Sequence, residues 1–254
     1  MIEFDSLTVK IGERYIVKNA DLRANDGEIT VLLGKNGSGK TTLIRSVFST
    51  RGATSGGKIL LDGKNVAKLG RKALARMAGL LPQSLKAPEM TVRELVTLGR
   101  SPYTGSFSAL SKNDKAKVDE AIATLGLSEL EGRSVASLSG GERQTAYLAM
   151  LLAKDVRNIL LDEPTASLDS HGKSRLFRLL TELKESGISV IAVLHDLTDA
   201  VSLADRIYLL ESGTLTSPMT PSEFVTSGLP ERIFEETAYT VRTRLGTETV
   251  FRPI

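Results

Sequence analysis

Two short stretches of the chain combine residue types that hold phosphate groups. Residues 34–41 read Gly-Lys-Asn-Gly-Ser-Gly-Lys-Thr and match the pattern G-x-x-x-x-G-K-S/T. Residues 138–142 read Leu-Ser-Gly-Gly-Glu. There Ser139 is a good helix N-cap, and two glycines let a ligand approach backbone N–H groups at the positive end of a helix dipole. On the residues alone, the two stretches could serve one nucleotide or two.

The first stretch has the surroundings that a phosphate-binding loop needs. Successive backbone N–H groups form a nest, Lys40 supplies positive charge to the β- and γ-phosphates, and the Thr41 hydroxyl suits Mg²⁺. An apolar run at 29–33 precedes the loop and a helical pattern at 40–48 follows it. The alternative is a glycine-rich turn without a ligand. The strand–loop–helix order favours the phosphate site.

A second apolar run, 159–161, ends in two carboxylates, Asp162 and Glu163. Asp162 is suited to hold Mg²⁺ through water, and Glu163 to orient or deprotonate an attacking water. A solvated acidic turn explains such a strand end equally well when it stands alone. Downstream of a phosphate-binding loop it indicates hydrolysis of a nucleotide.

Composition excludes several classes of protein. Among 254 residues, 33 Lys and Arg are scattered among 30 Asp and Glu, so no basic stripe for nucleic acid is evident. There is no cysteine, which excludes disulfides and thiolate metal sites. No apolar run approaches the ~20 residues that span a bilayer, and the first residues lack a signal-peptide pattern. We expect any link to a membrane to come through a partner.

The remaining pattern alternates strands and helices. Short strands with turns near 12–13 and 26–27 open the chain, and apolar runs at 159–161 and 188–194 flank a helical stretch, which predicts βαβ units and a parallel sheet. Thr91 and Ser111 begin capping boxes in a mainly helical region. The predicted organisation is one domain with an α/β core at 1–82 and 155–220, a helical subdomain at 83–154 and a tail at 221–254. The tail is expected to form two short helices and a hairpin that turns near Gly246.

Residues 34–41, 138–144 and 161–164, in this order, resemble the ATP-binding subunit of an ABC transporter. The resemblance covers residues 1–234. It implies an α/β fold, a P-loop NTPase core of mainly parallel sheet with an antiparallel β edge and an inserted helical subdomain. It also implies an ATPase that uses Mg²⁺ with ATP as its substrate.

The resemblance assigns further roles. It implies that Tyr15 stacks on adenine, although a strand tyrosine packed on the edge sheet is the alternative. It implies that Gln83 reaches the Mg²⁺ and the attacking water, and that His195, at a strand end, contacts the γ-phosphate. The implied catalytic residues are Glu163, His195 and Gln83, and the implied Mg²⁺ ligands are Thr41, Gln83 and Asp162. The implied ATP-binding residues are Tyr15, Gly34, Lys35, Asn36, Gly37, Ser38, Gly39, Lys40, Thr41 and Thr42.

The resemblance also gives the second glycine-rich stretch a purpose. It implies that this stretch contacts the γ-phosphate held by the loop of a second copy, so that two copies share each site. The residues implied to bind ATP in this way are Ser139, Gly140, Gly141, Glu142 and Asp169. Asp169 could instead be only a helix N-cap. Thr145 stands where many relatives carry Arg, and His171 is expected in an exposed turn.

One segment bears on the class of transporter. Residues 98–103, Leu-Gly-Arg-Ser-Pro-Tyr, resemble a segment of importers for iron–siderophores, haem or vitamin B12, and belong to the face expected to meet the membrane partner. A plain helix end is the alternative. An iron–siderophore importer is the preferred interpretation. It implies a homodimer on the cytoplasmic face of the membrane with two polytopic permease subunits and an extracytoplasmic substrate-binding protein.

A different class is also compatible with the motifs. Soluble ABC ATPases that act on DNA or ribosomes resemble the same three stretches. They typically carry long coiled-coil insertions, zinc modules or a second ATPase unit, and residues 83–138 show no sustained heptads. The expectation is therefore a transport subunit without a nucleic-acid partner.

Overall fold

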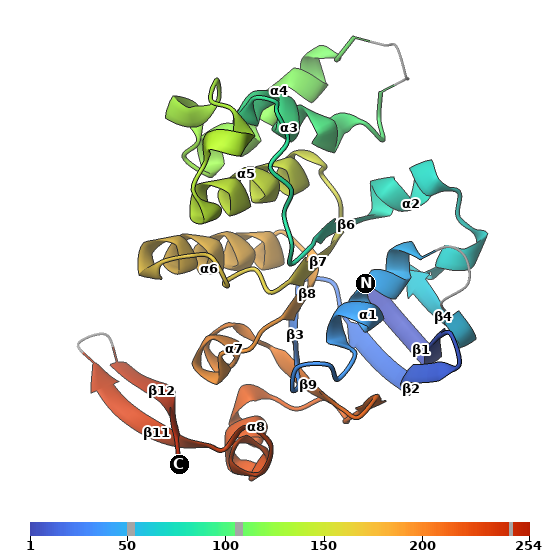
Figure 1. Ribbon diagram of the computed structural model, residues 1–254, viewed down its shortest axis with the longest axis vertical. Coiled ribbons are helices and arrows are strands. Elements are labelled where there is room, and N and C mark those ends of the chain that lie inside the picture. The colour runs from blue at the N-terminus through green and yellow to red at the C-terminus, as the bar shows by residue number, and fades with distance from the viewer. Residues whose placement is uncertain (50–53, 105–108, 244–245) are drawn as a thin grey trace. The chain divides into compact units, whose positions relative to one another are not determined.

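The computed structural model describes residues 1–49, 54–104, 109–243 and 246–254. It divides into two compact units (Figure 1). Unit 1 comprises Met1–Lys68 and Leu180–Ile254, and unit 2 comprises Leu69–Leu179. The expected helical subdomain, 83–154, falls within unit 2, and its boundaries stay a prediction.

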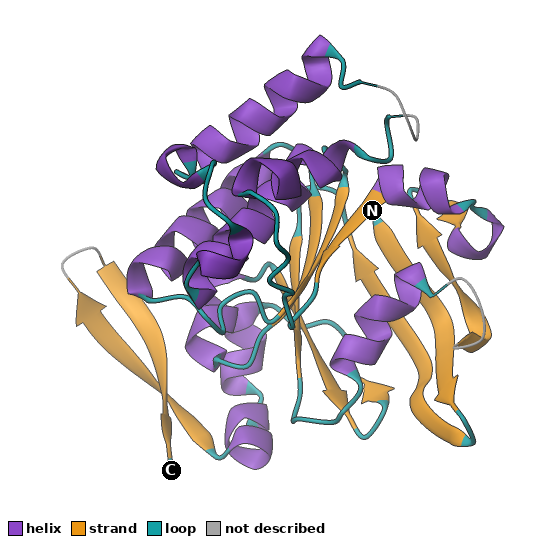
Figure 2. Ribbon diagram, turned by 45° about the horizontal axis from the view of Figure 1, so that its top comes forward, coloured by secondary structure: helices purple, strands orange, loops and turns teal. Residues whose placement is uncertain are grey.

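Unit 1 contains an antiparallel sheet of three long strands and one short one (Figure 2). Its order is β2-β1-β4-β5, with β1 at Ile2–Ile11, β2 at Arg14–Ala24, β4 at Thr54–Leu61 and β5 at Lys64–Asn65. Every second residue of β1 is buried, except that Phe4 and Leu7 are three positions apart. The pairing register shifts between these two residues, and Ser6 has a φ of 48°. Such a bulge lets both residues face the core. The two N-terminal strands are therefore longer than the short strands expected from the sequence.

The parallel strands of unit 1 form its core. Their order is β10-β9-β3-β8, with β3 (Ile29–Leu33) parallel to both β8 (Ser189–Val193) and β9 (Arg206–Glu211), and with β10 at Thr214–Leu215. Every residue of β3 and β8 is buried, as expected of parallel strands covered on both faces. Helix α1 spans Lys40–Arg45 and continues as a 3₁₀ turn at Ser46–Phe48, a second 3₁₀ turn spans Val66–Lys68, and α7 spans Leu197–Leu203.

The C-terminal tail packs on α7. It comprises α8 (Pro221–Thr226), a π-helical turn (Pro230–Phe234) and the hairpin of β11 (Glu236–Thr243) and β12 (Gly246–Pro253). The Phe251 N–H donates to Thr198 Oγ1 at 3.2 Å, and the Phe251 and Phe224 ring centroids lie 6.4 Å apart. The expected two short helices and hairpin are confirmed. Gly246, near which the turn was expected, is the first residue of β12 and pairs with Thr243; residues 244 and 245 lie outside the described part.

Unit 2 joins a parallel strand pair to a group of helices. The strands are β6 (Ala78–Leu81) and β7 (Asn158–Asp162). The helices are α2 (Arg71–Met77), α3 (Val92–Thr97), α4 (Lys112–Thr124), α5 (Gly140–Ala153) and α6 (Ser170–Glu185). The last residues of α6 belong to unit 1. Three 3₁₀ turns span Leu98–Arg100, Ser128–Leu130 and Val135–Ser137.

Helices α3, α4 and α5 pack together (Figure 1). Each of them begins with a capping box. In a capping box the first side chain and a carboxylate three residues later satisfy each other's backbone N–H groups. The helix starts expected at Thr91, Ser111 and Ser139 are thus confirmed. No helix within the described ranges combines the length and apolarity needed to cross a membrane.

Candidate functional site

The glycine-rich loop of unit 1 curves around one buried ammonium group. Lys40 is 5% exposed, and its Nζ donates to Gly34 O at 2.7 Å and to Lys35 O at 3.1 Å. Gly37 and Gly39 have φ angles of 77° and 110°, which side chains rarely adopt. The chain therefore forms the loop that the pattern predicts, directly after β3.

Glycine is also required sterically at the start of this loop. A Cβ on Gly34 would collide with the backbone oxygen of Leu210 and lie 2.8 Å from Ser38 Oγ. A Cβ on Gly39 would lie 3.0 Å from Ile16 Cγ2. The first and last glycines of the motif thus have a packing role in addition to any contact with phosphate.

His195 lies at the same sheet edge as this loop. Strands β3 and β8 are parallel, and Leu32 of β3 pairs with Val193 of β8. Gly34 follows Leu32 by two residues and His195 follows Val193 by two residues, so both lie just beyond the carboxyl ends of neighbouring strands. His195 is exposed. The carboxyl ends of parallel strands are where α/β sheets bind ligands, and the structure places this pair there.

Tyr15 lies near the start of β2 and is 52% exposed. The Lys10 ammonium lies 5.3 Å from its ring centroid. The ring is not packed into the edge sheet, which was the alternative to a base-stacking role. The exposed ring is compatible with stacking.

Unit 2 places two of the predicted catalytic residues in contact. Leu81 of β6 pairs with Leu161 of β7, so Gln83 and Glu163 again lie two residues past a paired position. Gln83 Nε2 donates to Glu163 Oε2 at 2.7 Å. Asp162, the last residue of β7, is 1% exposed. The resemblance implied that Gln83 and Glu163 act on the same attacking water, and the structure brings the two side chains together.

The backbone of Glu163 is held in an unfavourable conformation. Its φ is 56°, in the left-handed region that costs a residue with a Cβ about 1–2 kcal/mol. A cavity of about 290 Å³ adjoins it, with Gln83, Gly140 and Asp162 among its lining residues. Such strain persists only where surrounding contacts impose it, and it is common at functional sites.

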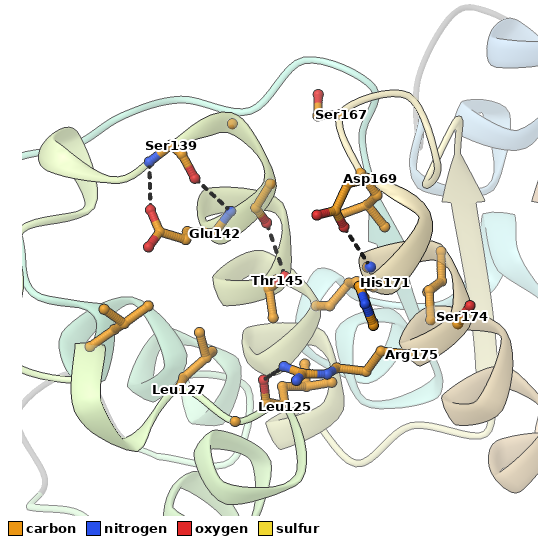
Figure 3. Close-up of a pocket in the computed structure, with 18 of the residues that line it drawn as sticks. Leu125, Leu127, Ser139, Glu142, Thr145, Ser167, Asp169, His171, Ser174 and Arg175 are labelled. Atoms are coloured by element: carbon orange, nitrogen blue, oxygen red, sulfur yellow. Dashed lines mark hydrogen bonds between the residues drawn. The ribbon is translucent and has the colours of Figure 1, made fainter.

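The second glycine-rich stretch forms the start of α5 (Figure 3). Ser139 is the N-cap, the Glu142 N–H donates to Ser139 Oγ at 3.3 Å, and the Ser139 N–H donates to Glu142 Oε2 at 2.8 Å. The backbone N–H and then the hydroxyl of Ser139 hold the pKa of Glu142 below its ordinary value. The Glu142 carboxylate is therefore engaged in capping the start of its own helix.

The two glycines of this stretch also pack against the segment after β7. A Cβ on Gly140 would lie 3.6 Å from Ser167 Cβ, and a Cβ on Gly141 would lie 3.2 Å from Ser167 O. The close approach therefore disfavours a side chain at Gly141, whereas a Cβ on Gly140 would make only an ordinary contact. A cavity of about 770 Å³ adjoins both glycines, and Ser139, Asp169 and His171 also line it.

Asp169 caps helix α6 in the structure. Its Oδ1 accepts the Gly172 N–H at 2.7 Å (Figure 3), so the N-cap role raised as an alternative is present. His171 lies in the first turn of α6 and not in an irregular turn, although it is exposed as expected. Both residues line the larger cavity beside the start of α5.

Sequence reasoning missed one residue of this region. Gln144 on α5 is 4% exposed, and its side-chain amide donates to the backbone oxygen of Pro164. The signal was available, since helical spacing places Gln144 on the same face as Leu148 and Leu151, both buried. A single amide on an apolar helix face indicates a specific partner.

Comparison with known proteins decides the family. The family model for the ABC transporter matches residues 17–166, more than half of the chain. This chain belongs to the ABC transporter family. The match contains the glycine-rich loop, the stretch at the start of α5 and the two carboxylates at the end of β7.

Curated relatives of this ABC transporter protein match almost its whole length. The ferric enterobactin transport ATP-binding protein FepC of Escherichia coli (strain K12) is 38% identical over 232 residues, which is 91% of this chain and 85% of the relative. The petrobactin import ATP-binding protein FpuD of Bacillus anthracis is 39% identical over 235 residues, 92% of this chain and 86% of the relative.

Solved structures agree with this assignment. A putative metal-chelate type ABC transporter in an inward-facing conformation matches with a TM-score of 0.85 and 25% identity, covering 100% of this chain and 97% of that chain. A dimeric, post-hydrolysis ATP-binding cassette, MJ0796, bound to ADP and Pi, matches with a TM-score of 0.76 and 27% identity, covering 87% and 99%. The α/β ABC ATPase fold predicted from the sequence is confirmed.

The segment expected to indicate the class of transporter, 98–103, is partly buried in this ABC transporter protein. A Cβ on Gly99 would collide with the backbone oxygen of Met150 on α5. Arg100 is 3% exposed and forms an ion pair with Asp114 at 2.9 Å. Leu98, at 49% exposed, is the large apolar residue that this segment leaves at the surface. Gly99 and Arg100 therefore stabilise the helical insertion and do not contribute to its outer surface.

Proposed function

We propose that this chain is the ATP-hydrolysing subunit of an importer that carries a metal chelate, with a ferric siderophore as the cargo. The observation that carries the proposal is the similarity of nine-tenths of the chain to import subunits named for ferric enterobactin and petrobactin. The metal-chelate type of a similar solved transporter supports the same cargo class.

The glycine-rich loop is proposed to bind the triphosphate of ATP. Lys40 already lies within the loop with its ammonium directed at backbone oxygens, and its charge would stabilise the β- and γ-phosphates. Residues Gly34 to Thr42 would supply backbone N–H groups and hydroxyls. The exposed ring of Tyr15 would stack on the adenine.

Mg²⁺ is proposed to bind with ATP, through Thr41, Gln83 and Asp162. The donor set fits, because hydroxyl, amide and carboxylate oxygens are the ligands that Mg²⁺ takes, together with substrate phosphates and water. Within the described ranges no group of three or more His, Asp or Glu residues could hold a metal ion. The expected ligand set is therefore a small one completed by the nucleotide. When bound, Mg²⁺ would neutralise charge that develops on the phosphates.

Glu163 is proposed to orient and deprotonate the attacking water. Its carboxylate accepts a hydrogen bond from Gln83, and its backbone is held in a strained conformation at a strand end. Gln83 would position the same water through its amide. His195, exposed at the corresponding edge of unit 1, would contact the γ-phosphate and report its presence.

The start of α5 is proposed to act on a second copy of the chain. Ser139, Gly140 and Gly141 offer a hydroxyl and open backbone at the positive end of a 14-residue helix. Glu142 and Asp169 would orient this surface, since each stabilises a helix start beside it. ATP would then favour the closed homodimer over separate copies, and hydrolysis would reopen it. A dimeric solved cassette of similar fold supports this arrangement.

The assembled importer would contain this homodimer, two polytopic permease subunits and an extracytoplasmic substrate-binding protein. The homodimer would lie on the cytoplasmic face of the membrane. The segment 83–85, which lines the smaller cavity beside Glu163, would link the permease to the hydrolytic residues.

The deciding experiment is co-purification of this chain with its permease and binding protein, followed by ATPase assays in proteoliposomes. The binding protein loaded with a ferric siderophore should stimulate hydrolysis, and Glu163→Gln should abolish the stimulated rate. Stimulation by haem or vitamin B12 instead would overturn the proposed cargo. Association with ribosomes or DNA, and not with a polytopic protein, would overturn the transport role.

A further inference from the structure

Helix α5 carries one buried amide among its apolar contacts. Gln144 is 4% exposed and lies on the face that also buries Leu148 and Leu151. Burial of an unpaired amide is costly, so a side chain of this type is held in such a place by its hydrogen bond. That bond runs from Gln144 Nε2 to the backbone oxygen of Pro164, twenty residues away in the sequence.

The acceptor of this bond adjoins the strained residue of the site. Pro164 follows Glu163, and the φ of a proline is fixed by its ring, so few bonds can rotate between the Pro164 oxygen and the Glu163 backbone. Gln83 holds the other end of Glu163 by donating to its carboxylate at 2.7 Å. Glu163 is thus restrained through its main chain by Gln144 and through its side chain by Gln83.

The same helix begins at the stretch assigned to the nucleotide of a second copy. Gln144 lies five positions after the N-cap Ser139, within the second turn of α5. A shift of the helix when Ser139 meets a phosphate would therefore be carried by Gln144 to the segment that bears Glu163. This step rests on the proposed function of the α5 start.

We propose that Gln144 is a positioning residue that links the start of α5 to the orientation of the Glu163 carboxylate. Its role is to fix Glu163 for attack on the γ-phosphate. It acts through the main chain of Pro164.

The neighbouring Thr145 provides a matched control. Its Oγ1 donates to Gly141 O at 2.9 Å, inside the same helix (Figure 3), and among the described contacts it has no hydrogen bond to the segment after β7. Thr145→Val keeps the shape and removes a hydroxyl that serves α5 alone. Comparison of variants at the two positions therefore distinguishes the loss of a bond between segments from a general effect on α5.

The test compares steady-state ATP hydrolysis of Gln144→Met, Gln144→Asn and Thr145→Val in the full chain. Met keeps the length of the side chain without a donor, and Asn keeps the amide on a shorter side chain. Both should lower kcat about 10- to 100-fold, the loss typical of a small misplacement of a reacting group, with KM for ATP nearly unchanged. Thr145→Val should hydrolyse ATP within about two-fold of the parent, since this half-buried hydroxyl makes one hydrogen bond inside its own helix and its loss is a small perturbation.

A cycle with Glu163→Gln distinguishes positioning from a loss of folded protein. If Gln144 acts through Glu163, the double variant should hydrolyse ATP no more slowly than Glu163→Gln alone. Stoichiometric binding of ATP to each variant shows that it is folded. The proposal would be overturned if the Gln144 substitution lowered the hydrolysis rate of Glu163→Gln by the same factor as it lowers the rate of the parent. Full activity of both Gln144 variants would also overturn it. An inactive parent chain, or an active Glu163→Gln, would instead refute the proposed function on which this inference rests.

Discussion

Replacement of Arg100 tests whether the class-associated segment, 98–103, is a structural part of the helical insertion or a surface for the membrane partner. The Arg100 guanidinium pairs with Asp114 at 2.9 Å, donates to Ala153 O at 2.8 Å and lies 4.1 Å from the Tyr103 ring centroid. All these groups belong to unit 2. The Arg100 side chain is 3% exposed, so methionine should replace its volume without its charge or donors.

The expected loss follows from the group that is left behind. Removal of one partner from a buried ion pair costs about 3–5 kcal/mol, because the other charge stays buried. The Asp114 carboxylate keeps the hydrogen bonds that the backbone N–H and the hydroxyl of Ser111 donate to it. The Ser111 hydroxyl and then Arg100 hold the pKa of Asp114 below its ordinary value. We therefore expect Arg100→Met to lower the free energy of unfolding by about 3 kcal/mol, the lower end of this range. In a chain of this size that loss corresponds to a fall in Tm of about 6–12 °C.

Thermal unfolding followed by circular dichroism measures this loss, and Arg93→Met is the matched control. Arg93 also pairs with two carboxylates, Asp119 and Glu131, but its side chain is 44% exposed. Exposed pairs contribute about 0–1 kcal/mol, so this variant should shift Tm little. Adding Asp114→Asn to Arg100→Met should recover part of the loss, because no buried charge then remains. Equal Tm values for Arg100→Met and Arg93→Met would refute the reasoning.

Three further outcomes are expected from changes near the proposed site. Glu163→Gln should keep ATP binding and slow hydrolysis by about 10²–10⁴-fold, the contribution of a general base, in a phosphate-release assay. Ser139→Arg should prevent ATP-dependent dimerisation in size-exclusion chromatography while each copy still binds ATP. The stability that Glu142 contributes is present above its ordinary carboxyl pKa and is lost as the pH falls through its lowered pKa in the folded protein. Urea unfolding of Glu142→Gln, which keeps an acceptor, should therefore lose stability less steeply with acid than the parent does.

The strand-end residues of this site could be predicted because their positions follow from local patterns. An apolar run that ends in Asp162 and Glu163 places both carboxylates at the edge of a parallel sheet, whatever the rest of the chain does. His195 follows another such run. The capping box at Ser139 also depends on residues only three positions apart. Each of these predictions needed no knowledge of distant contacts.

Other features depend on partners that no local pattern identifies. Arg100 follows a helix end, where an arginine is usually exposed, and its burial is determined by Asp114 fourteen residues later. The left-handed backbone of Glu163 has no signal in its residue type, since such a φ in a residue other than glycine is imposed by its surroundings. The bulge at Ser6 is partly predictable, because the break in the alternation of apolar and polar residues between Phe4 and Leu7 is visible in the sequence.

Helix α5 is bonded to both segments of unit 2 that carry the proposed hydrolytic residues. Its start presents Ser139, its second turn holds the Pro164 oxygen through Gln144, and at its end the Lys154 ammonium donates to Ala78 O at 2.9 Å. Burial lowers the pKa of Lys154, so that bond is made in a partly desolvated setting where it is stronger than in water. Ala78 begins the strand that leads to Gln83. A displacement of α5 therefore acts on strand β6 through Lys154 and on the segment that bears Glu163 through Gln144, because both hydrogen bonds come from this helix and its C-cap. If the start of α5 meets its phosphate only in a second copy, the geometry of the hydrolytic residues depends on that copy as well.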